Sequence, residues 1–90
     1  LLQANNLLPD DSRILYYLGK SYSGLEEYSD AALTFRKALK IGPEDPEIYF
    51  ALGKSYYRLN KNKKVNETLD ILNMLDRSLY EQLYLEVGGK

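Results

Sequence analysis

Two Gly-Lys-Ser triplets are the first residues of this sequence that could do chemistry. They are residues 19–21 and 53–55, and Gly-Lys-Ser is the end of a loop that cradles nucleotide phosphates. That loop also needs a glycine five residues before its second glycine, and Ile14 and Ile48 occupy those positions. Both triplets lie in segments with helical periodicity, where the backbone amides are already hydrogen-bonded. We therefore expect no phosphate-binding loop.

Catalytic and metal-binding side chains are scarce in the chain. It has no His and no Cys, so it lacks the commonest general base, the commonest transition-metal ligand and the thiolate nucleophile. A serine nucleophile would need a lysine base, but Lys20 and Lys54 recur with an internal repeat, which indicates an architectural role. The carboxylates in residues 44–47 are explained by their favourable place at a helix N-terminus. We expect no enzyme activity, no cofactor and no metal site.

Charge is unevenly spread along the 90 residues, which form one domain at most. Residues 1–35 carry two basic and five acidic residues. Residues 36–64 carry eight basic and three acidic residues, and residues 65–90 carry two basic and five acidic residues. The blocks therefore have charges of −3, +5 and −3, and the net charge is −1. This small net charge argues against nucleic acid as a partner. The basic middle could bind an acidic segment or could simply be a solvated surface.

The sequence contains no apolar run of membrane-spanning length and no signal-peptide pattern. We expect no membrane association, and a cytoplasmic location is the expectation although the sequence does not fix the compartment. The chain begins Leu1-Leu2-Gln3, without Met and within a helical pattern. This start indicates a fragment of a larger protein.

An internal repeat relates the first half of the chain to the second. Leu18-Gly19-Lys20-Ser21-Tyr22 recurs unchanged as residues 52–56, and Pro9 and Pro43 are separated by the same interval. Within each unit, apolar residues recur at spacings of three and four, which is typical of amphipathic helices. The sequence therefore predicts pairs of antiparallel helices, one pair in each unit.

Caps and glycines refine this prediction. Asp11 and Asp45 are suited to N-caps, and Pro46 would occupy the first helical position after Asp45. A glycine inside a helix destabilises it by roughly 1 kcal/mol relative to Ala. Gly19 and Gly53 therefore indicate close approach of a partner helix, for which the small residues Ala31 and Ala38 are the expected contacts.

Residues 12–45 resemble a tetratricopeptide repeat, through Leu15-x-x-Leu18-Gly19-x-x-Tyr22 and then Ala31, Phe35, Ala38 and Pro43. The resemblance implies an all-α, right-handed superhelical solenoid of about six helices in antiparallel pairs. It divides the chain into the end of a preceding repeat (residues 1–11), two repeats (residues 12–45 and 46–79) and a C-terminal capping helix (residues 80–90).

The last helix has two possible starts. Ser78-Leu79-Tyr80-Glu81 fits a capping box, which predicts a break near residues 76–78 and a helix that ends at Gly88-Gly89. The alternative is one long helix from about residue 63, because no proline interrupts this region. We favour the break.

The family resemblance also implies a concave groove lined by the first helix of each pair. Such a groove usually holds an extended peptide or a partner helix. Two aromatic–lysine pairs at i, i+4 spacing would lie on it, Tyr16 with Lys20 and Phe50 with Lys54. These pairs could bind an acidic, partly apolar segment or could merely stabilise exposed helices. The complete set of expected groove residues is Arg13, Tyr16, Lys20, Glu47, Phe50, Lys54, Tyr57 and Arg58.

The predicted function is protein–protein interaction without catalysis, as a scaffold or adaptor that presents this groove to an acidic protein or peptide. The alternative is a structural spacer or self-association element that uses the ends of the array, since open ends of solenoids tend to stack. Residues Leu1, Leu2, Leu83 and Val87 would then make the contacts. We accordingly expect a monomer or weak self-association.

Overall fold

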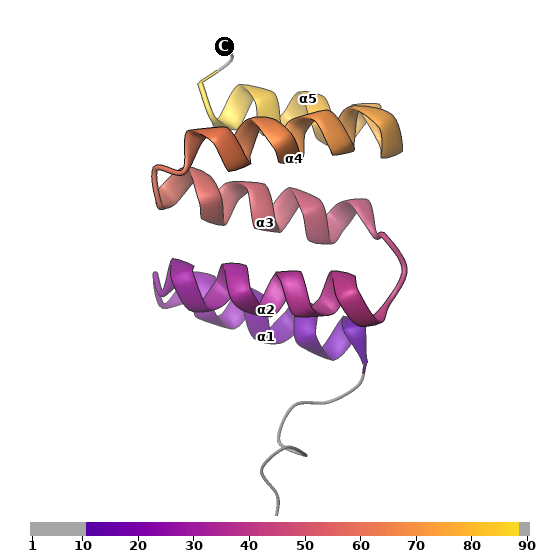
Figure 1. The fold of residues 1–90 in the computed structure, drawn as a ribbon. Coiled ribbons are helices and arrows are strands. Elements are labelled where there is room, and N and C mark those ends of the chain that lie inside the picture. The colour runs from indigo at the N-terminus through magenta and orange to yellow at the C-terminus, as the bar shows by residue number, and fades with distance from the viewer. Residues whose placement is uncertain (1–10, 89–90) are drawn as a thin grey trace, which may run out of the picture.

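The fold is a stack of antiparallel α-helices joined by short turns (Figure 1). A computed structural model describes residues 11–88, and these residues form five helices and no strand. Each helix packs against the next, and α3 also packs against α1 and α5. The all-α helix pairs are as predicted, and the expected leading helix lies outside the described residues. The helices are α1 (Ser12–Gly24), α2 (Tyr28–Ile41), α3 (Pro46–Arg58), α4 (Asn62–Leu75) and α5 (Arg77–Glu86).

The first four helices repeat at the interval seen in the sequence. The offset between α1 and α3, and between α2 and α4, is the one that separates Leu18 from Leu52. Both predicted N-caps are confirmed. A carboxylate oxygen of Asp11 accepts a hydrogen bond from the backbone N–H of Arg13 at 2.8 Å, and one of Asp45 accepts from that of Glu47 at 2.9 Å. These bonds satisfy donors that the first turn of a helix leaves free.

The turns within the two helix pairs share an unusual backbone conformation. Glu26 and Asn60, which occupy equivalent positions of the two repeats, both have φ of 62°. This left-handed region is unfavourable for residues with a side chain, and Asn tolerates it better than Glu. The neighbouring Gly24 does not serve this purpose, because it has no positive φ and ends α1 as an ordinary helical residue.

The two glycines that recur with the repeat mark where helices approach most closely. A Cβ added to Gly19 would lie 2.5 Å from Cε1 of Phe35, so the close approach is confirmed. The three nearest atoms belong to the ring of Phe35 rather than to Ala31 or Ala38, the residues that the sequence suggested. Phe35 belongs to one continuous cluster of buried apolar residues: Leu15, Ala31, Ala32, Phe35, Ala38, Ile48, Leu52, Tyr56, Val65, Leu69, Leu72 and Leu83.

Helix α5 closes the C-terminal end of the described core. The chain breaks at Asp76, so the single long helix from residue 63 does not form. Asp76 is also the N-cap, accepting from the N–H of Leu79 at 3.1 Å, whereas the capping box had predicted Ser78. The expectation that Leu83 forms an exposed end was wrong, because its side chain is fully buried. A Cβ on Gly53 would lie 2.6 Å from Cδ2 of Leu83, which shows how closely α5 packs on α3.

Candidate functional site

Six of the eight expected groove residues lie together where α1 and α3 face each other. They line two adjoining hollows of about 150 and 490 Å³, and Tyr16, Lys20 and Glu47 line both. Phe50 and Lys54 complete the smaller hollow, and Arg13 lies in the larger one. We call this continuous surface the α1–α3 groove. It is formed because the equivalent faces of two repeat-related helices are brought side by side.

The two aromatic–lysine pairs form as the i, i+4 spacing predicted. The Lys20 ammonium nitrogen lies 5.5 Å from the centre of the Tyr16 ring, and that of Lys54 lies 5.3 Å from the centre of the Phe50 ring. Both aromatic rings are half-buried while both lysines are exposed. Each pair therefore offers an apolar contact surface beside a charged group that is accessible to solvent.

The groove is continuous with the core beneath it. The ring centre of Tyr16 lies 6.0 Å from that of Phe35, which lines the smaller hollow although it is otherwise buried. Phe35 in turn packs against Gly19. The position of Tyr16 is therefore fixed by packing that also holds α1 against α2, and the groove is a preformed surface.

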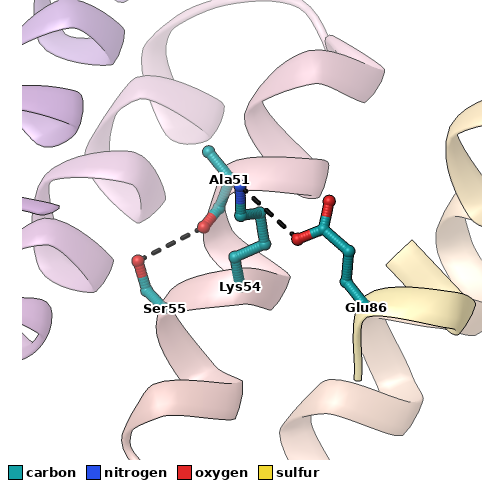
Figure 2. A network of polar contacts seen from close by, with 4 residues as sticks. All are labelled: Ala51, Lys54, Ser55 and Glu86. Carbon is teal, nitrogen blue, oxygen red and sulfur yellow. Dashed lines mark hydrogen bonds and ion pairs between the residues drawn. The ribbon is translucent and has the colours of Figure 1, made fainter. Parts of the chain in front are cut away.

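One lysine of the groove already has a partner in the chain. The ammonium nitrogen of Lys54 lies 3.6 Å from a carboxylate oxygen of Glu86 on α5, and both side chains are about half exposed (Figure 2). Ser55, one residue later, points to the other side of α3 and donates a hydrogen bond to the backbone oxygen of Ala51 at 3.2 Å. The Lys54–Glu86 pair could not be found from the sequence, because no spacing rule relates α3 to α5.

The charge of the groove is balanced. Asp45 lines the larger hollow together with Glu47, and Glu86 borders Lys54. Three cations thus lie among three carboxylates, so the groove is less basic than the sequence suggested. The cations are Arg13, Lys20 and Lys54, and the carboxylates are those of Asp45, Glu47 and Glu86.

The last two expected groove residues, Tyr57 and Arg58, line neither hollow. Tyr57 is exposed, and the guanidinium carbon of Arg58 lies 5.9 Å from the centre of the Tyr28 ring on α2. Arg58 therefore lies beside an aromatic ring of α2, whereas the family resemblance implied a place in the groove.

Within residues 11–88, no three His, Cys, Asp or Glu side chains are grouped so that they could hold a metal ion. Among the five described helices, none combines the length and the apolar character that a membrane span requires. Burial raises the pKa of Tyr49 and Tyr56, and the nearby charge of Glu44 adds to the rise at Tyr49. These phenols therefore stay protonated at neutral pH and act as packing groups.

Comparison with protein families identifies a repeat in the middle of the chain. The family model of the TPR repeat matches residues 24–60, from the end of α1 through α2 and α3. A search of curated proteins and a search of solved structures found no match. The matched segment contains the second helix of one pair and the first helix of the next, which together make up one period of the repeat. Residues 24–60 are therefore identified as similar to a tetratricopeptide repeat.

Proposed function

We propose that the chain is a non-enzymatic interaction module that binds a peptide or a helix of a partner protein in the α1–α3 groove. Tetratricopeptide repeats generally mediate protein–protein interaction. The observation that carries the choice of surface is the side-by-side placement of Tyr16 with Lys20 and Phe50 with Lys54 along one hollow. Tyrosine is among the residues that are enriched at the energetic centres of protein interfaces, and a lysine beside it can pair with a carboxylate of the ligand.

The two ends of the groove favour different parts of a ligand. At the Lys54 end, Glu86 already neutralises the cation, so the ring of Phe50 offers apolar contact. At the Lys20 end, Arg13 adds a second cation. We propose a ligand with an apolar side chain over Phe50 and a carboxylate that pairs with Lys20.

A pull-down from lysate of the source cell tests this proposal with matched variants. Lys20→Glu reverses one charge in the groove, and Lys40→Glu makes the same change on an exposed position of α2 that lines neither hollow. We expect Lys20→Glu to lose a partner that the unmodified chain and Lys40→Glu both retain. Circular dichroism checks that each variant is folded. A partner that all three proteins capture equally would refute the groove as its binding site.

A second candidate function, self-association through an end of the array, is favoured by one observation on α1. Ile14 is 52% exposed, whereas its repeat equivalent Ile48, on the α3 helix that packs against α2, is only 2% exposed. Leu25 is also exposed, while its equivalent Leu59 is half-buried. This apolar face of α1 could pack on another copy. Sedimentation velocity at increasing protein concentration tests this self-association. A mass that stays that of the monomer at every concentration would exclude this function.

A further inference from the structure

We propose that the chain has a second binding surface, between α2 and α4, that takes an acidic segment of a partner protein with an apolar side chain in its centre. This surface is a hollow of about 250 Å³, which we call the α2–α4 hollow. It is separate from the α1–α3 groove, and the two have no lining residue in common. In Figure 1, α2 and α4 lie on the near side of the molecule, and α1 and α5 lie behind them. The side chains that carry the argument are Leu33, Arg36, Tyr56, Leu59, Lys61 and Lys64.

The hollow has an apolar base and wall. Tyr56 is 7% exposed, Leu59 is half-buried and Leu33 is 54% exposed. The exposed side chain of Leu33 does not stabilise the free chain by apolar burial. A ligand side chain placed against it would remove apolar surface from water, which favours binding. A single aliphatic side chain is therefore the part of a ligand that the centre of the hollow fits.

The other side chains around the hollow are cationic. Arg36 from α2, Lys61 from the α3–α4 turn and Lys64 from α4 are all exposed. The ion pairs found among residues 11–88 are Lys54–Glu86 and Arg77–Glu81, so none involves these three cations. No carboxylate lines the hollow. The electrostatic complement of this surface is a segment with several carboxylates.

The charges that act on Tyr56 agree with this picture. Its pKa is raised mainly by burial, while the charge of Arg36 lowers it and that of Glu67 raises it again. Lys64 also lies over the same ring, with its nitrogen 5.8 Å from the ring centre. Glu67 is the carboxylate whose charge acts on Tyr56, and it does not line the hollow, whose charged lining residues are all cations. The hollow keeps a net positive charge, in contrast to the balanced groove.

An acidic protein segment suits the hollow better than a nucleic acid does. Single-stranded nucleic acids bind through bases stacked on exposed aromatic faces. The aromatic ring in the hollow, Tyr56, is buried and is partly covered by Lys64. An aliphatic side chain flanked by carboxylates needs no stacking surface, and it uses both the wall of Leu33 and the cations around it.

Fluorescence anisotropy with a labelled peptide of alternating Glu and Leu tests the proposal on the full 90-residue chain. The informative variant is Arg36→Glu with Lys64→Glu. Its matched control is Lys40→Glu with Lys63→Glu, which makes the same charge change on the same two helices at exposed positions outside the hollow. We expect the first pair to weaken binding by about tenfold or more and the control pair by about twofold or less, because only the first reverses charges in direct contact.

Three further measurements separate this surface from the alternatives. Lys20→Glu reports any binding of the same peptide to the α1–α3 groove, and the loss caused by Arg36→Glu with Lys64→Glu should keep its full size in the Lys20→Glu background, so failure of the groove proposal and failure of this one are distinguishable. Arg36→Gln with Lys64→Gln should also lose binding, and circular dichroism should show the native helix content in every variant. Leu33→Ser should weaken binding of the Glu-Leu peptide but not of an all-Glu peptide of the same length.

Several results would overturn the proposal. The first is that the Glu-Leu peptide does not bind at millimolar concentration. The second is that the control variant, Lys40→Glu with Lys63→Glu, loses as much affinity as Arg36→Glu with Lys64→Glu. The third is that the chain binds the all-Glu peptide as tightly as the Glu-Leu peptide. Tighter binding of an oligothymidylate that the Arg36→Glu and Lys64→Glu variant abolishes would assign the surface to nucleic acid instead.

Discussion

Gly19 of α1 lies directly against the aromatic ring of Phe35 on α2, so closely that a Cβ at this position would sit 2.5, 2.7 and 2.9 Å from three ring carbons. Real Cβ atoms do not approach other heavy atoms this closely, so either the ring or the helix would have to move. Phe35 is fully buried, and its ring also lies against Tyr16 of the groove. This contact therefore links the stability of the first helix pair to the shape of the groove.

The Gly19–Phe35 contact predicts that Gly19→Ala destabilises the chain. Alanine gains roughly 1 kcal/mol in helix propensity, but overpacking a tight core usually costs about 1–3 kcal/mol. We expect a net decrease of about 1 kcal/mol in the free energy of unfolding, measured by urea denaturation. Gly24→Ala is the control, because nothing lies within 4 Å of its added Cβ. It should be neutral or stabilising, and a stabilising Gly19→Ala would contradict the close packing.

The left-handed turn between α1 and α2 predicts a stabilising substitution. Glu26 has φ of 62°, a conformation that costs a residue with a side chain roughly 1–2 kcal/mol. Glycine adopts it freely but loses more chain entropy on folding. We expect Glu26→Gly to raise the free energy of unfolding by about 0.5–1 kcal/mol, which thermal denaturation would detect as a shift of a few degrees.

Asn60 provides the matched comparison for that substitution. It has the same φ at the equivalent position of the second pair, but Asn tolerates the left-handed region through local hydrogen bonds. Asn60→Gly should therefore change stability much less than Glu26→Gly. Equal gains at both positions would show that backbone strain at Glu26 is not the cause.

High pH should destabilise the chain through Tyr49, which is half-buried, and Tyr56, which is buried. Burial raises the folded-state pKa of Tyr49 and Tyr56 above the ordinary value of 10.0. The folded state thus holds these protons more tightly than the unfolded state, so this contribution to stability is complete below pH 10 and is lost as pH rises through the folded-state pKa.

The measurement is the midpoint of thermal unfolding at about pH 9 and about pH 11. We expect a smaller drop between these values in the Tyr49→Phe and Tyr56→Phe double variant than in the unmodified chain. Deprotonation of lysines affects both proteins alike and cancels in this comparison. An identical drop in both proteins would mean that the two phenols do not contribute.

The helices of the two pairs could be predicted because their signals are local. Asp11 and Asp45 cap helices whose side chains recur at helical spacing, and the aromatic–lysine pairs lie within single helices. The first residue of α5 could not be predicted from local sequence alone. Ser78 begins a capping box, but Asp76 is used instead, and the earlier start accompanies burial of Leu83 against α3.

The parts of the site that the sequence did not reveal are contacts between helices. Glu86 reaches Lys54 only because of the register of α5 on α3. Arg58 was expected in the groove, yet its guanidinium group lies over the ring of Tyr28 on another helix. The cations around the α2–α4 hollow likewise gather there because α2 and α4 both pack against α3. Residue types and spacing carry no information about such registers.

Helix α5 should contribute strongly to stability through Leu83. This side chain is fully buried between helices, whereas Leu85 on the same helix is 73% exposed. Replacing a buried leucine by alanine typically lowers the free energy of unfolding by about 2–5 kcal/mol. Replacing an exposed leucine usually changes it by about 0.5 kcal/mol or less. We therefore expect a large loss of stability for Leu83→Ala and almost none for Leu85→Ala in urea denaturation.

The same leucine predicts coupling with Gly53, because a Cβ on Gly53 would lie 2.6 Å from Cδ2 of Leu83 and 3.2 Å from Cγ2 of Thr68. Gly53→Ala should destabilise the unmodified chain, but in the Leu83→Ala background the methyl group would enter space that the leucine has vacated. A double-mutant cycle should therefore show a favourable coupling of about 1 kcal/mol. If the effects of the two substitutions on the free energy of unfolding are additive, the added methyl group clashes with Thr68 and not with Leu83. In that case α5 is not the reason that α3 needs a glycine at this position.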